Sequence, residues 1–117
     1  MTDDQQAWLR RRVHILLRAT GDEYSQLGEF DEGLHGYEVA SLPALRSQID
    51  EALDTLTERE AHAMRLGFGL DDGRSRTLEA AGRAMGITAE RVRQLEAAGL
   101  KKLREPTRRA LLPRAIP

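Results

Sequence analysis

Apolar residues recur at helical spacing in two adjoining runs between Thr77 and Arg104. Intervals of three and four residues place the apolar side chains of each run on one face of a helix. The two stripes consist of Leu78, Ala81 and Met85 in the first run, and of Val92, Leu95, Gly99 and Leu103 in the second. Gly86 separates the runs, so the pattern predicts two short helices joined by a tight turn.

Threonine residues stand where both of these helices are predicted to begin. The hydroxyls of Thr77 and Thr88 can each accept a backbone N–H of the first turn. Gly86 tolerates a positive φ, and Ile87 can fill the corner between the helices. The face of the second helix opposite its stripe carries Glu90, Arg91, Arg93, Gln94, Ala97 and Lys101. This layout is typical of a helix-turn-helix that places its second helix in the major groove of DNA, although a plain helical hairpin with a solvated charged face shares it.

Two further helices are predicted upstream of this unit. Ser41 can cap the first of them, with Pro43 just inside its start. The apolar face of that helix consists of Leu45, Ile49, Leu53 and Leu56. Residues 57–60 have the pattern of a capping box, which predicts a second helix that runs to about Leu66 and ends near Gly67.

Pro106 is expected to end the second helix of the helix-turn-helix. Thr107 is expected to cap a short final helix through Leu112. Between the capping-box helix and the helix-turn-helix, residues 68–75 are predicted to form a loop, with Asp72-Gly73 as its turn signal. No segment has a convincing strand pattern, so the predicted fold class is all-α.

The N-terminal part is predicted to contain one amphipathic helix, Gln5–Ala19. Its apolar side consists of Trp8, Leu9, Val13, Leu16 and Leu17. We expect it to pack against the helix that carries Leu45 and Ile49, within the chain or across a dimer. Residues 20–41 contain four glycines and many acids without sustained periodicity, which predicts a linker or an irregular ordered loop. The expected division is therefore 1–41 and 42–117.

Charge is distributed unevenly along a chain whose net charge is only −1. Residues 20–60 hold eleven acidic and two basic residues, a net charge of −9, whereas residues 83–117 hold nine basic and three acidic residues, a net charge of +6. The basic part can approach phosphate groups. The acidic part is expected to face a protein or the basic helix of the chain itself.

Few side chains offer catalytic or metal-binding chemistry. The chain has no cysteine, and its three histidines lack companions at metal-ligand spacing. We therefore expect no enzyme activity, no cofactor and no metal. The acidic N-terminus and the lack of a long apolar stretch predict a cytoplasmic protein without a secretory signal or a membrane span.

Flanking motifs make the helix-turn-helix pattern more specific. The segments LDTLTERE, FGLDDG, TLEAAGRAMGIT, ERVRQLEA and KKLREP follow one another between about Ile49 and Leu112. In this order and spacing they resemble region 4 of the sigma-70 family of bacterial RNA polymerase sigma factors. The resemblance implies binding to promoter DNA and to the β-subunit flap of RNA polymerase. Nothing before Leu42 resembles the promoter-melting region 2, so a second protein supplying region 2, or a regulator, is a further expected partner.

The candidate base-reading residues lie on the second helix. Gln, Arg and Glu side chains complement adenine, guanine and cytosine edges in the major groove. The residues of these types are Glu90, Arg91, Arg93 and Gln94. The resemblance implies base contacts for Glu90 and Gln94, and base or phosphate contacts for Arg93 and Lys101.

Candidate phosphate contacts come from the resemblance alone. It implies that Arg59, Arg65 and the backbone around Thr77 and Leu78 hold phosphate groups. For each of these side chains taken singly, a solvated surface residue is the more common role.

Three positions depart from the family pattern. Ala89 and Ala98 stand where promoter readers usually carry Arg and Lys, and Gly67 replaces another basic residue. Each lost cation weakens the electrostatic part of DNA binding. Two functions therefore stay open: a DNA-binding transcription regulator, and a sigma-like interaction module that binds RNA polymerase or a regulator without productive DNA reading.

Overall fold

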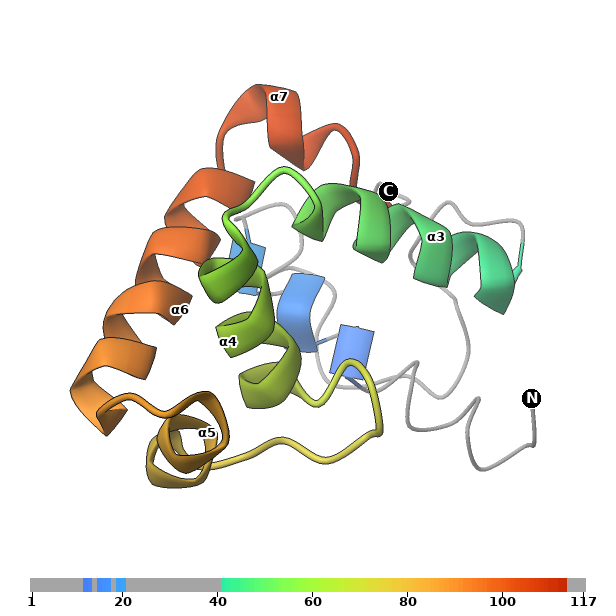
Figure 1. Cartoon of the computed structure of the whole chain (residues 1–117). Coiled ribbons are helices and arrows are strands. Elements are labelled where there is room, and N and C mark those ends of the chain that lie inside the picture. Colours follow the sequence, from blue (N-terminus) through green and yellow to red (C-terminus); the bar gives the residue numbers. More distant parts are fainter. Residues whose placement is uncertain (1–11, 14, 18, 21–40, 114–117) are drawn as a thin grey trace.

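The computed structural model describes residues 12–13, 15–17, 19–20 and 41–113. Five helices are assigned in the continuous part: α3 (Leu42–Leu53), α4 (Glu58–Phe68), α5 (Leu78–Met85), α6 (Ala89–Leu103) and α7 (Pro106–Arg109). The described residues before them are also helical, and no described residue is in a strand. Figure 1 shows α4 at the centre, with α6 and α5 on one side of it and α3 on the other. The all-α class is confirmed.

Local capping chemistry fixes where the helices begin. The Ser41 hydroxyl accepts the Ala44 N–H at 3.2 Å, and Thr57 exchanges hydrogen bonds with Glu60 in a complete capping box. Thr77 and Thr88 accept the N–H groups of the third residue of α5 and of α6. Four of the five predicted N-caps are therefore confirmed.

Three helix boundaries differ from the prediction. Helix α4 continues past Gly67 to Phe68, and Gly69 (φ 66°) is the left-handed residue that ends it. Thr107 does not cap the final helix, because Pro106 is already the first residue of α7 and Glu105 is its N-cap. The fixed φ of proline suits this first position. Helix α7 ends at Arg109, three residues before the expected end.

The core consists of two adjoining apolar clusters. The larger one joins α3, α4 and the C-terminal half of α6, and the smaller one joins α4, α5 and the N-terminal half of α6. Val92 and Leu95 contribute to the smaller cluster, and Leu103 to the larger. Helix α6 therefore buries its apolar stripe along its whole length and exposes the opposite face.

The N-terminal segment 12–20 belongs to the larger cluster. Val13, Leu16 and Leu17 are buried together with Leu45 and Ile49 of α3, so the predicted packing is found within one chain for these residues. Trp8, Leu9 and the acidic segment 21–40 lie outside the described residues. Dimer formation and the boundary at residue 41 stay predictions.

Two glycines allow close approaches of backbone that set the helix crossings. A Cβ on Gly82 would lie 2.7 Å from the Ile87 carbonyl oxygen, so α5 approaches the turn closely only without a side chain there. A Cβ on Gly99 would lie 2.5 Å from the Met64 sulfur. Gly99 therefore lets α6 approach α4 closely.

Candidate nucleic-acid interface

Helix α6 presents a polar face to solvent. The predicted residues of this face, Glu90, Arg91, Arg93, Gln94, Ala97 and Lys101, are all exposed. Helix α5 packs across the N-terminal half of α6, and Gly86 (φ 72°) makes the left-handed turn between the two helices. This is the arrangement of a helix-turn-helix with an accessible second helix.

Side chains on the exposed face of α6 are paired with one another. Arg93 donates two hydrogen bonds to the Glu90 carboxylate, at 2.9 and 2.6 Å. This contact lowers the pKa of Glu90, so the carboxylate is ionised at neutral pH and can accept a hydrogen bond from a base. Arg91 Nη1 is 3.4 Å from the Gln94 side-chain oxygen. The four side chains thus form two adjoining pairs in the first two turns of the helix.

The proposed phosphate-binding residues differ in whether acidic side chains already hold them. Thr77 and Leu78 stand at the N-terminus of α5, where the first N–H groups of a helix attract anions. Arg59 is exposed near the start of α4, and no acidic partner contacts it among the described residues. Arg65 instead donates to Asp50 of α3 at 2.9 Å and to Asp71 at 3.5 Å. The structure therefore holds Arg65 between α3 and the loop after α4.

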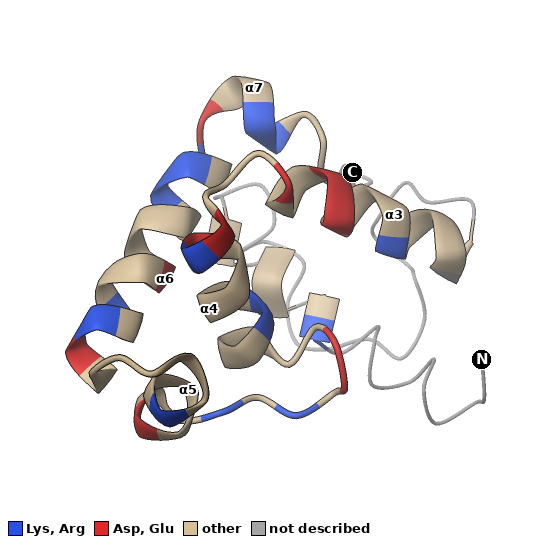
Figure 2. Cartoon of the chain, in the orientation of Figure 1, with Lys and Arg blue, Asp and Glu red and all other residues tan. Residues whose placement is uncertain are grey.

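That loop leads into α5 and is ordered by one carboxylate. Asp72 accepts two hydrogen bonds from the Arg76 guanidinium, at 2.8 and 3.2 Å, and one from the Arg74 N–H at 3.1 Å. These contacts lower the pKa of Asp72 to about 2. The Arg76 side chain is thereby fixed just before the N-terminus of α5, and Figure 2 shows basic positions on the loop that leads into α5.

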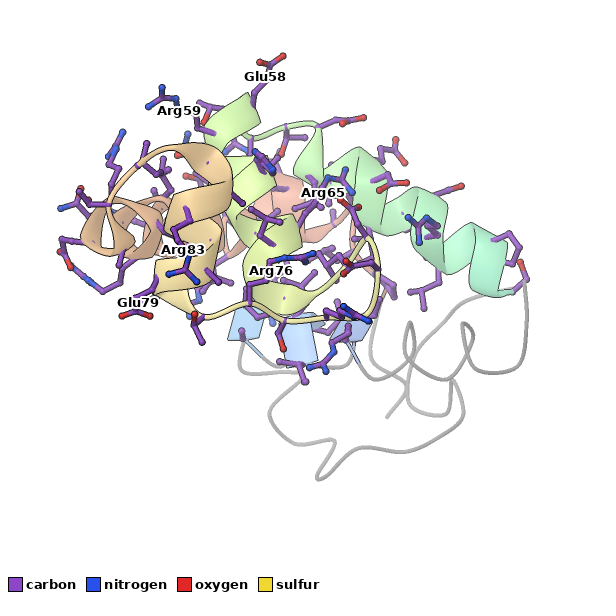
Figure 3. All side chains as sticks on the ribbon, turned by 60° about the horizontal axis from the view of Figure 1, so that its bottom comes forward. Glu58, Arg59, Arg65, Arg76, Glu79 and Arg83 are labelled. Carbon is purple, nitrogen blue, oxygen red and sulfur yellow. The ribbon has the colours of Figure 1, made fainter. Side chains whose placement is uncertain are left out.

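Arg83 is an exposed cation that the sequence reasoning did not single out. It lies on α5, the helix that crosses the DNA backbone in a helix-turn-helix, and Figure 3 shows its side chain extending from the helix. It has no acidic partner within the part of the chain that the structure describes.

Gly67, one of the three departures, lies beneath an acid. The Glu96 carboxylate of α6 covers Gly67, so that a Cβ there would lie 2.0 Å from Glu96 Oε1. Partial burial raises the pKa of Glu96, and no hydrogen bond or ion pair with a described residue compensates it. A carboxylate thus occupies the place where the family pattern has a cation.

Replacing Glu96 with Gln is expected to stabilise the fold slightly at neutral pH. A carboxylate with a raised pKa costs stability when it is ionised, and this cost disappears as the pH falls below the folded-state pKa. We expect a gain of about 0.5 kcal/mol at pH 7, once solvent screening of the half-exposed group is allowed for. Thermal unfolding from pH 7 to pH 3 should show the gain shrinking toward zero. The exposed Glu79→Gln is the matched control, and a gain for Glu96→Gln that does not change with pH would contradict the assignment.

Fold and site together define a helix-turn-helix protein with an exposed recognition helix. Residues 52–105 match the family described as Sigma-70, region 4. The chain thus carries a sigma-70 region 4 domain, which is a non-enzymatic transcription-factor domain. No helix among the described residues is long and apolar enough to cross a membrane.

Curated relatives point to the same family. RNA polymerase sigma factor SigA of a Bacillus species is 50% identical over 90 residues, which span 74% of this chain and 24% of the relative. SigA of Listeria monocytogenes and SigA of Listeria innocua are each 49% identical over 90 residues, with the same coverage. The chain therefore spans about a quarter of the length of these relatives.

Proposed function

We propose that this chain binds promoter DNA through the exposed face of α6 and that it binds RNA polymerase during transcription initiation. The observation that carries the proposal is the free polar face of α6, which holds Glu90, Arg91, Arg93, Gln94 and Lys101 on a region 4 fold. Such side chains match base edges and phosphates in the major groove. Thr77, Leu78, Arg59 and Arg65 are proposed phosphate contacts, and the β-subunit flap is the proposed polymerase contact.

Unpaired cations supply the electrostatic attraction in this proposal. Among the described residues near α5 and α6, those without an acidic partner are Arg59, Arg74, Arg83, Arg91, Lys101 and Arg104, the last of which is held by the Ala19 carbonyl. Arg65 and Arg93 are partly neutralised by the acids that hold them. The effective number of phosphate contacts is therefore expected to be about four or five, with a slope near −4 for log K against log salt concentration.

A salt titration tests this expectation. Fluorescence anisotropy would follow binding to a promoter duplex and to a scrambled duplex between about 50 and 200 mM salt. We expect a preference for the promoter duplex and a slope that falls by about one unit in Arg59→Ala. Equal weak binding to both duplexes, with persistent binding to RNA polymerase, would favour the second function below.

The second function is a sigma-like interaction module that binds RNA polymerase, or a regulator that recognises region 4, without reading DNA productively. The Glu96 carboxylate over Gly67 favours it, because a negative charge near the interface repels phosphate. A second protein that supplies region 2 is a proposed partner in the first function. Both functions place the protein in the cytoplasm, where bacterial transcription takes place.

A further inference from the structure

Residues outside the matched family segment complete the core of the region 4 fold. Val13, Leu16 and Leu17 are 2%, 0% and 0% exposed, although the match to the family covers only residues 52–105. Their cluster partners include Leu53, Met64 and Leu103 of α3, α4 and α6. Figures 1 and 3 both show the described pieces of segment 12–20 alongside α4.

The apolar spacing of this segment is that of a helix lying in a groove. Val13, Leu16 and Leu17 stand at positions i, i+3 and i+4, and the described residues around them are helical. Amphipathic helices that bind grooves of other proteins use these positions as anchors. Ile15, which points away from this stripe, is 42% exposed.

Both ends of the segment are held by arginine contacts with backbone carbonyls. At the C-terminal end, the Arg104 guanidinium donates to the Ala19 carbonyl oxygen at 2.8 and 3.2 Å. At the N-terminal end, Arg12 Nε donates to the Gly73 carbonyl oxygen at 3.3 Å. The segment is thus held like a bound helical peptide, by an apolar stripe and by a contact at each end.

We propose that the groove between α3, α4 and the C-terminal half of α6 is a helix-binding site that residues 12–20 occupy as a ligand in cis. A helix of RNA polymerase with the same apolar spacing competes for this groove. The last part rests on the proposed binding to polymerase. Occupancy in cis lowers the fraction of binding-competent protein, and the apparent affinity for a competing helix falls by that fraction. The groove is then closed to polymerase until the segment is displaced.

Binding of the segment in trans tests the first part without polymerase. A synthetic peptide with residues 1–20 would be titrated into Leu16→Ala, in which the cis segment has lost its central anchor but the groove is intact. Trp8 is the only tryptophan of the chain, so the titrated protein carries the variant Trp8→Phe and the peptide alone reports binding by its fluorescence. We expect saturable binding at least tenfold tighter than to the protein with Leu16 intact, and no binding of a scrambled peptide.

A second variant covers a failure of Leu16→Ala to fold. Val13→Ala shortens a smaller anchor of the cis segment and leaves the groove and the Arg104 contact unchanged for the peptide. It should also bind the peptide more tightly than the parent chain does. If neither variant binds the peptide more tightly than the parent chain, segment 12–20 is an inseparable part of the core and the proposal is wrong.

Polymerase binding tests the competition. Core RNA polymerase would be titrated with the parent chain, with Arg104→Ala and with Arg46→Ala, which removes a cation of α3 that contacts no acid among the described residues. The hydrogen bond from the charged Arg104 side chain helps to hold the segment in the groove. Its loss should therefore tighten polymerase binding about threefold to tenfold in Arg104→Ala alone. Equal affinity of the three proteins would overturn the competition. If the parent chain and both variants fail to bind polymerase while the peptide binds, the polymerase half of the proposed function fails and the cis ligand stands.

Discussion

Replacing Gln94 with Ala is expected to weaken binding to the promoter duplex by roughly tenfold or more and to remove the preference over a scrambled duplex. Gln94 is exposed on the second turn of α6, where its side chain contacts Arg91. A glutamine can bind adenine through two hydrogen bonds, and loss of such a pair costs about 1–3 kcal/mol of discrimination. Fluorescence anisotropy with the two duplexes at one fixed salt concentration would measure the effect.

Lys101→Ala is the comparison that separates base reading from phosphate contact. Lys101 is exposed on the same face and has no acidic partner within the described part of the chain. Its removal should weaken binding to both duplexes by a similar factor and lower the salt slope by about one unit. Equal losses for both duplexes in Gln94→Ala would place Gln94 among the phosphate contacts. No loss for either duplex would place it outside the interface.

Replacing Gly82 with Val is expected to cause a large loss of stability in the helix-turn-helix. The first added atom would lie 2.7 Å from the Ile87 carbonyl oxygen and 3.3 Å from the Ala89 nitrogen, both of which are backbone atoms. Neither can rotate away, so α5 must move relative to α6. Such overpacking costs about 1–3 kcal/mol, which corresponds to a fall in Tm of roughly 4–8 °C per kcal/mol in a domain of this size.

Gly86→Ala is the matched control for this change. A Cβ on Gly86 meets nothing within 4 Å, so only the cost of its left-handed conformation remains, about 1 kcal/mol. Thermal unfolding by circular dichroism should therefore rank Gly82→Val well below Gly86→Ala. The reverse order would show that the close approach of the two helices is not what Gly82 provides.

Features set by neighbouring residues were predictable from the sequence. Ser41, Thr57, Thr77 and Thr88 all cap helices as expected, because an N-cap depends on atoms only two or three residues away. The buried and exposed faces of α6 were also predicted, since a period of 3.6 residues fixes which side chains share a face.

Features set by distant residues were not predictable in the same way. The end of α4 was expected near Gly67, whereas the left-handed Gly69 that ends it lies against the backbone of Arg74 and Ser75 in the following loop. The neighbour of Gly99 depends on how α6 crosses α4, and the pairing of Arg65 with Asp50 depends on how α3 folds back. The placement of the proposed base-reading residues followed from the helix period, whereas the pairing of Glu90 with Arg93 needed side-chain geometry.

One carboxylate has a consequence for any attempt to transplant the recognition element. Glu60 closes the capping box of α4 and also accepts Lys102 of α6 at 2.8 Å, with its side chain only 8% exposed. A graft of α5 and α6 onto another scaffold would arrive without this acid, leaving the Lys102 ammonium group and the last turn of α6 without their anchor. Any portable unit of this protein therefore has to include α4 from its cap at Thr57, and not the helix-turn-helix alone.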